Sequence, residues 1–217
     1  KGDSEMAEER GAAQLRSANA VRAYQRDWLE NTRQRVMQGE PFAICNGDEF
    51  EDVFNIMDIP VIVINYWNSL ITTKRMGDHY NDVLIKRGYP ANYFALGLAS
   101  TMDNNPEMAP WGGLPKPALI IGGTKSDTEM KVLEVWAREY GCPFFPLDFG
   151  LDAVPDWAYP PPPRWWEKMA DHWDELIDSR RLDLRVEEEK ALINYIEVTT
   201  GKRLSLARLQ QGLELLN

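Results

Sequence analysis

The chain contains little cysteine, with only Cys45 and Cys142 among its 217 residues. Two cysteines do not make a disulfide framework in a chain of this length. Such low cysteine content is typical of proteins from a reducing compartment. Long apolar stretches are also missing: the longest, 59–64 and 118–121, are far too short to span a bilayer as a helix. No apolar stretch follows the first residues, so no signal peptide is recognised in this sequence. We therefore expect a cytoplasmic protein with no membrane partner.

Several motifs that carry known chemistry are absent from the sequence. There is no GxxxxGK[ST] phosphate loop, no GxGxxG after a strand, no CxxC pair and no HExxH zinc motif. Because His79 and His172 are the only histidines, a histidine-rich metal site is excluded. We expect His79 to lie on a solvated helix face and His172 to be a packing or interface residue.

Basic residues are in the minority. The 24 Lys and Arg residues face 34 Asp and Glu residues, which gives a formal net charge of -10. An acidic surface repels phosphate backbones, and no Lys/Arg-rich block interrupts it, so we expect no nucleic-acid partner. The apolar share of 44% is enough for one sizeable core, or for one full domain and part of a second.

Apolar stretches and turn residues predict an alternation of strands and helices. Buried strands are predicted at 41–45, 59–65, 116–122 and 144–147. Helices are predicted between them at 48–57, 70–87 and 126–140, the last opened by a capping box of Ser126 and Glu129. Such alternation predicts right-handed crossovers and a parallel sheet covered by helices. The expected fold class is α/β, with a doubly wound, flavodoxin-like domain over residues 40–150.

Helical segments are predicted on both sides of this domain. Residues 1–39 form an N-terminal helical arm, in which the apolar spacing predicts one or two helices over 4–38. Residues 151–163 end in four consecutive prolines and form a stiff connector. Residues 164–217 form a helical segment that starts a second domain, with helices at 165–178, 186–199 and from 205 onward. We expect the apolar stripes of these helices to lack a complete partner within this chain.

Three polar segments follow predicted strands, at residues 45–49, 65–69 and 123–127. Open α/β sheets bind ligands beyond the carboxyl ends of their strands, and amide, hydroxyl and carboxyl groups beside aromatic surface can line a pocket for a small acyl group. The same residue types also build turns and helix caps, so a structural role is favoured for any one of them alone. No catalytic residue and no metal ligand is assigned. The candidate substrate-binding residues are Asn46, Glu49, Asn65, Trp67, Asn68, Thr124 and Ser126.

A long loop is predicted over residues 96–117, and it contains the sequence Trp111-Gly112-Gly113. Loops of this length often carry function. The glycine-rich part can bend over a ligand or pack on a neighbouring chain. The alternative is an Ω-type loop that fills a surface groove.

Four stretches of the chain resemble, in order, the benzoyl-CoA reductase / 2-hydroxyacyl-CoA dehydratase family, which includes the D-component of 2-hydroxyglutaryl-CoA dehydratase. They are residues 46–63, with an acidic helix start before an Ile-Pro-Val strand; 86–104, with a helix that ends in Gly-Tyr; 114–148, with a strand, a Thr-x-x-Asp turn, a helix and a second strand; and 196–217, with a Thr-Gly helical segment. Together they cover most of residues 40–217.

The resemblance implies an oxygen-sensitive, hetero-oligomeric enzyme of anaerobic metabolism that acts on a CoA thioester. Related subunits bind [4Fe-4S] clusters through cysteine, and an ATP-dependent activator or a ferredoxin donates the electron. The reaction is either benzoyl-CoA-type ring reduction, an oxidoreductase activity, or 2-hydroxyacyl-CoA dehydration, a lyase activity. The Gly-Tyr-Pro and Trp-Gly-Gly-Leu-Pro-Lys-Pro stretches are closer to the benzoyl-CoA reductase branch. The implied partners are a related cluster-bearing subunit, the electron donor and the CoA thioester substrate.

The chain departs from the family at the cluster ligands. The family's Thr-x-Cys-Asp turn is Thr124-Lys125-Ser126-Asp127 here, and residues 93–100, where the family has an early ligand, contain no cysteine. A hydroxyl is less acidic and less soft than a thiol, so serine is a poor cluster ligand. We therefore expect a subunit that binds no cluster of its own. Two alternatives stay open: a structural or assembly subunit that kept the fold, and an unrelated flavodoxin-like module that binds a small molecule.

Overall fold

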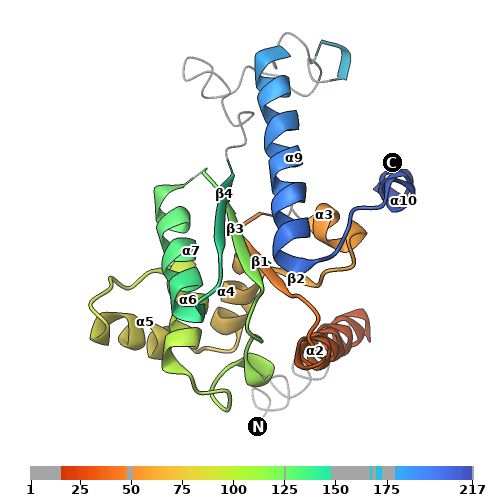
Figure 1. Cartoon of the computed structure of the whole chain (residues 1–217). Helices are drawn as coiled ribbons and strands as arrows, with labels where there is room; N and C mark the ends of the chain where they lie inside the picture. Colours follow the sequence, from red (N-terminus) through yellow and green to blue (C-terminus); the bar gives the residue numbers. More distant parts are fainter. Residues whose placement is uncertain are drawn as a thin grey trace. The chain divides into compact units, whose positions relative to one another are not determined.

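The computed structural model describes residues 16–47, 51–124, 126–147, 167, 170–172 and 179–216 (Figure 1). The chain divides into two compact units, Lys1–Glu40 and Pro41–Asn217. Within the described ranges, none of the helices has the length and apolar character needed to cross a membrane.

The described part of the first unit is helix α2, Arg16–Met37. Glu30 and Arg33 pair one turn apart at 2.6 Å, and this hydrogen bond lowers the pKa of Glu30. Gly39, with a φ of +91°, follows the end of the helix as the sequence predicted. The helical prediction over 4–38 is therefore confirmed for α2, and residues 4–15 lie outside the described ranges.

The second unit is built on a four-stranded, all-parallel sheet. Its strands are β1 (Ala43–Cys45), β2 (Val61–Val63), β3 (Leu119–Gly123) and β4 (Phe144–Leu147). Their order is β2-β1-β3-β4. In the register of the sheet, Cys45 pairs with Val63 and Ile120 pairs with Phe144. The four predicted strands and the doubly wound, flavodoxin-like α/β arrangement are thus confirmed.

The strand order creates a switch point between β1 and β3. From β1 the chain moves outward to β2, and it then returns past β1 to form β3 and β4 on the other side. The connections that leave β1 and β3 diverge from this point, so the sheet opens there at its carboxyl edge.

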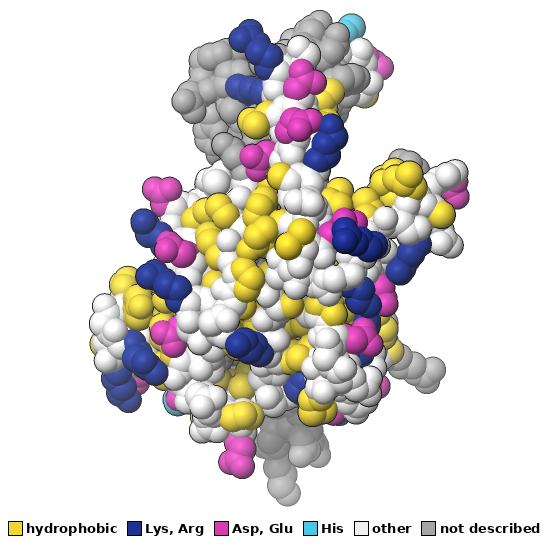
Figure 2. All heavy atoms as spheres, viewed as in Figure 1, with side chains coloured by type: hydrophobic (Ala, Val, Ile, Leu, Met, Phe, Trp, Pro, Cys, Tyr) yellow, Lys and Arg dark blue, Asp and Glu magenta, His cyan; other side chains and the backbone are white. Residues whose placement is uncertain are grey.

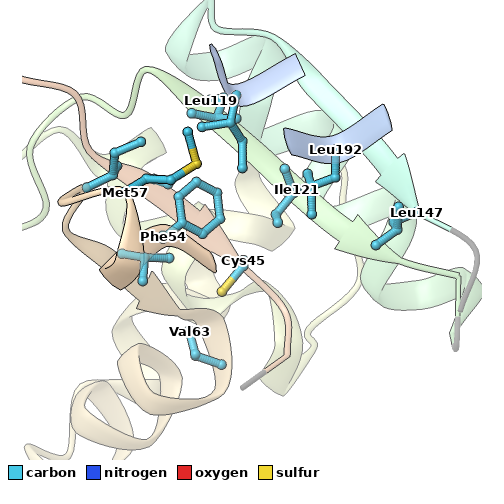
Figure 3. Packing of buried hydrophobic residues seen from close by; sticks show 12 residues of the cluster. Cys45, Phe54, Met57, Val63, Leu119, Ile121, Leu147 and Leu192 are labelled. Carbon is cyan, nitrogen blue, oxygen red and sulfur yellow. The ribbon is translucent and has the colours of Figure 1, made fainter. Parts of the chain in front are cut away.

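One face of the sheet is covered by α3 (Glu51–Ile56) and α9 (Ser179–Thr200). Phe54 from α3 and Leu192 from α9 join alternate strand residues in one buried apolar cluster (Figure 3). Burial of apolar surface between the sheet and these two helices is the dominant stabilising contribution to their packing. This face therefore anchors α9 although its sequence lies far from the strands.

The opposite face is covered by α4 (Ile64–Thr73), α6 (Leu96–Asp103) and α7 (Asp127–Tyr140), and α5 (Gly77–Lys86) packs on α6 (Figure 1). Trp67 and Trp136 are fully buried in this layer. The sheet is thus buried on both faces, which explains why its strands are continuous apolar stretches.

Two predictions for this layer were wrong. The helix expected at 70–87 is two helices, because Arg75 takes a left-handed φ of +58° between α4 and α5. The loop expected over 96–117 begins with α6 and contains a short 3-10 turn, η3 (Pro110–Gly112). Residues 96–99 and Met102 are all buried, so α6 lacks the polar face by which a surface helix is recognised in a sequence.

The helices after the Pro-rich stretch also differ from expectation, because α9 has a partner within the chain. Leu192 and Ile196 are fully buried against the sheet, and the ring of Tyr195 lies 4.7 Å from that of Phe145. α10 (Leu206–Leu216) follows Ser205 as predicted and packs on α3. The connector 151–163 and most of the helix predicted at 165–178 lie outside the described residues.

β4 is an edge strand of the described sheet, and it contains Pro146. The carbonyls of Pro143 and Leu147 accept hydrogen bonds from β3, so the odd-numbered residues of β4 face their neighbour strand. Pro146 therefore turns its ring nitrogen outward, where it offers no N–H to a further strand.

A Gly97→Ala substitution tests the closest contact in the α4–α6–α7 layer. A Cβ at Gly97 would lie within 3.0 Å of ring atoms of both Trp67 and Trp136. We expect the free energy of unfolding to fall by about 1–3 kcal/mol from overpacking. Gly77→Ala is the matched control, because a Cβ there meets no atom within 4 Å. Urea unfolding of both variants checks this, and equal midpoints would contradict the packing described.

Candidate functional site

The side chain of Asn46 joins the carboxyl ends of β1 and β3. Its Oδ1 accepts a hydrogen bond from the Gly123 N–H at 2.8 Å, and its Nδ2 donates to the Gly123 carbonyl at 3.4 Å. The same Nδ2 donates to the Glu129 carboxylate at 3.0 Å. Asn46 is only 7% exposed. Its amide thus acts as an additional peptide group across the switch point, beyond the last backbone pair of β1 and β3.

Helix α7 begins beside this amide. Ser126 is its N-cap, with its Oγ accepting from the Glu129 N–H at 3.5 Å, so the predicted cap is confirmed. The Thr124 N–H donates to the Leu147 carbonyl at 3.0 Å, and this bond extends the β3–β4 pairing. Thr124 is exposed. Thr124 and Ser126 therefore follow Gly123, the partner of the Asn46 amide, at the carboxyl end of β3.

The first turn of α7 carries two carboxylates, Asp127 and Glu129. They offset the positive end of the helix dipole, and they disfavour binding of a phosphate at this helix start. The donors of Asn46 are already used inside the fold. The edge thus favours a neutral polar group, such as an amide or a thioester carbonyl, over a phosphate.

Asn65 lies at the surface in the first turn of α4, directly after β2. Its carbonyl accepts from the Tyr93 hydroxyl at 3.4 Å, and that hydroxyl also pairs with Ser69 Oγ at 2.8 Å. Tyr66 beside it is 36% exposed, and burial of the rest of its ring raises the pKa of its hydroxyl. Tyr93 thus places a partly exposed aromatic side chain next to Asn65. Tyr93 is not among the candidate residues, because it lies far along the chain, after α5.

Trp67 and Asn68 lie in the interior of the α4–α6 layer, where both are 0% exposed. Asn68 Oδ1 accepts from the Gly97 N–H at 2.8 Å, and its Nδ2 donates to the Phe94 carbonyl at 3.1 Å. Because Ala95 has no capping side chain, Asn68 caps α6 from a neighbouring helix. The indole N–H of Trp67 donates to Ser100 Oγ at 3.4 Å. Both side chains are therefore used to position α6, and neither is accessible to a ligand in this structure.

The seven candidate residues thus fall into distinct places. Asn46, Thr124 and Ser126 lie in the segments that follow β1 and β3 at the switch point, and Asn65 lies in the first turn of α4, after the adjoining strand β2. Trp67 and Asn68 are internal. Glu49 lies outside the described residues.

The two cysteines do not converge. Cys45 ends β1 at the carboxyl edge and lies in the apolar cluster (Figure 3). Its buried thiol donates to the Gly47 carbonyl at 3.4 Å. Cys142 precedes β4 at the opposite edge, and burial raises the pKa of its thiol to about 11. In the described ranges, no group of three His, Cys, Asp or Glu side chains is arranged to hold a metal ion. These residues do not fit a [4Fe-4S] cluster, which needs several thiolates at one point.

No protein-family model matches the chain, and no curated protein sequence matches it. Its function is therefore inferred from the geometry of the switch point together with the four stretches of sequence that carry the family resemblance.

An Asn46→Ala substitution tests the amide bridge. It leaves the buried Gly123 N–H without its partner, and we expect the free energy of unfolding to fall by about 1–3 kcal/mol. The matched control is Asn65→Ala, where an exposed side chain is removed and the change is expected to stay within about 0.5 kcal/mol. Thermal or urea unfolding measures both. A loss no larger for Asn46→Ala than for the control would show that the bridge contributes little.

The raised pKa of Cys142 predicts slow alkylation of this thiol. In a Cys45→Ala variant, iodoacetamide at pH 8 is expected to react at least roughly tenfold more slowly with the folded than with the urea-unfolded chain, because only the thiolate reacts. The folded rate should keep rising toward pH 11, the value at which the folded thiol ionises, compared with 9.0 for an ordinary one. Since the folded pKa is raised, the stability that depends on the neutral thiol is complete below pH 9 and is lost toward pH 11. A plateau of the folded rate near pH 9 would contradict this environment.

Proposed function

We propose that this chain is a subunit, without a cluster of its own, of an oxygen-sensitive complex that acts on a CoA thioester. The observation that supports the proposal is the switch point, where Asn46 is bonded to Gly123 and the segment that follows Gly123 carries Thr124 and Ser126. By the sequence resemblance, Ser126 corresponds to a cluster cysteine of that family, and here it is the N-cap of α7. The chain's own residues thus supply pocket walls, and the partner subunit supplies the cluster.

The polarity of the edge supports a thioester rather than a phosphate as the group bound there. The hydroxyls of Thr124 and Ser126 and the amide of Asn65 can each donate to a carbonyl oxygen or accept from an amide N–H. The pantetheine arm and thioester of a CoA ester offer such groups. Asp127 and Glu129 keep the phosphates of the same ligand away from the start of α7.

The reaction proposed for the complex is benzoyl-CoA-type ring reduction or 2-hydroxyacyl-CoA dehydration. An ATP-dependent activator or a ferredoxin would donate the electron to the cluster-bearing partner. The role of this chain is to bind and orient the acyl group and to exclude water from it, which raises the rate by positioning.

A structural or assembly subunit is the second candidate, and α10 favours it. Leu206, Leu213 and Leu215 are 79%, 50% and 83% exposed on this helix. Exposed leucines on one helix are typical of a surface that contacts another protein. In that case substitutions on α10 would disrupt the complex, and substitutions at the switch point would leave turnover unchanged.

Turnover of the purified complex separates the two candidates. Thr124→Val removes a hydroxyl from the switch point, and we expect kcat/KM for the thioester to fall roughly three- to tenfold, the value of one hydrogen bond. Thr73→Val is the matched control, because this exposed threonine ends α4 away from the switch point. Unchanged turnover in Thr124→Val, in a complex of normal composition, would remove the support for a pocket wall.

The iron content of the separated subunits tests the absence of a cluster in this chain. After purification without oxygen and separation from the partner, we expect negligible iron and acid-labile sulfide in this chain and a full cluster in the partner. Stoichiometric iron in this chain would mean that the ligand positions have been wrongly assigned, and Cys45 and Cys142 would then be the first residues to replace.

A further inference from the structure

A groove of about 440 Å³ lies between the end of α5, the 3-10 turn η2 (Tyr93–Ala95), α6 and α7. We call it the α7 groove. Its floor is apolar and consists of Leu84, Ala95, Leu98 and Val132, all 9% exposed or less. The volume falls within the range of roughly 300–1,000 Å³ that is usual for small-molecule sites.

The rim of the α7 groove carries mainly hydrogen-bond donors. Lys131 and Arg138 lie on the α7 side, and Tyr89 and Asn92 lie on the opposite side. The Asn92 Oδ1 already accepts from the Phe94 N–H at 2.9 Å, which leaves its amide nitrogen as the group available to a ligand. A ligand that fits this rim must offer acceptor atoms.

The charge of the rim favours an anion. Lys131 forms no ion pair with any residue in the described ranges. Glu134, the one carboxylate among the described lining residues, lies 3.6 Å from Arg138, and both are well exposed. The two cations thus exceed the one anion around an apolar floor, in a chain whose net charge is -10. Figure 2 shows Lys and Arg side chains beside hydrophobic atoms on the side of the molecule formed by α5 and α7.

The groove is separate from the switch point. It uses the outward stripe of α7, Thr128, Lys131, Val135 and Arg138, at spacings that share one helix face. The switch point instead uses Glu129, which is turned toward Asn46. One helix therefore contributes to two sites by two different faces.

We propose that the α7 groove binds an apolar carboxylate, with its ring or chain on the Leu84–Leu98–Val132 floor and its carboxylate held by Lys131 and Arg138. This site does not depend on the CoA-thioester function, because no residue of the switch point takes part in it. The ligand class is an aromatic or aliphatic acid with one anionic end.

Fluorescence titration of the full chain with naphthalene-2-carboxylate tests the site. The neutral analogue naphthalene-2-carboxamide has the same ring and no charge, so it is expected to bind at least roughly fivefold more weakly. Equal affinity for the two compounds, or no saturable binding of the carboxylate, would overturn the proposal.

Three charge substitutions at exposed positions then test the site, two with expected effects of opposite sign and one as a control. Lys131→Glu is expected to weaken binding of the carboxylate at least roughly fivefold, and Glu134→Gln to strengthen it roughly two- to threefold by removing the competing anion. Lys86→Glu makes the same charge change on α5, outside the lining, and is expected to leave the affinity unchanged.

Circular dichroism verifies that all three variants keep the fold, which surface positions tolerate. A Lys86→Glu effect as large as that of Lys131→Glu would mean that general surface charge is measured, and the proposal would fail. It would also fail if Glu134→Gln weakened binding.

Discussion

The amide of Asn46 is the interaction on which the carboxyl edge of the sheet depends. At a switch point the two neighbouring strands send their connections to opposite sides, so no chain segment crosses between them. The backbone pairing of β1 with β3 stops at Ile44 and Ile120, and Asn46 continues it to Gly123. Through Glu129 the same amide also holds the start of α7. An apolar side chain cannot replace it, because Gly123 would keep a buried N–H without a partner.

A second buried asparagine uses the same device one layer away. Asn68 caps α6 in place of a local side chain, and its two hydrogen bonds offset the cost of removing an amide from water. The capped helix then presents Gly97 to Trp67 and Trp136, at a distance that only a glycine allows. Polar residues that follow strands are the usual candidates for ligand binding. Asn46 and Asn68 instead use their side-chain hydrogen bonds to stabilise the fold.

The sequence predicted the strands well, because a strand buried on both faces is a continuous β-branched stretch with no other common explanation. It did not predict α6, whose uniform burial removes the polar face. Trp67 and Asn68 fall in the polar segment after a predicted strand because the sequence predicts the helix from residue 70, whereas α4 begins at Ile64. With the helix beginning at Ile64, residues 64, 67, 68 and 71 share one face, and all four are buried. The pairing of Asn46 with Gly123 joins residues far apart in sequence, and no local pattern encodes it.

Charge along α7 connects the two proposed sites. Acidic residues in its first turn, Asp127 and Glu129, make the switch point unfavourable for anions. Lys131 lies one turn later and Arg138 lies in the last turn, and both line the α7 groove with its apolar floor. Because the effect of the helix dipole is confined to the first and last turns, Lys131 acts by its own charge, whereas Arg138 also offsets the negative end of the dipole. The distribution of charge along a single helix therefore favours a neutral acyl carbonyl at the switch point and a carboxylate in the α7 groove.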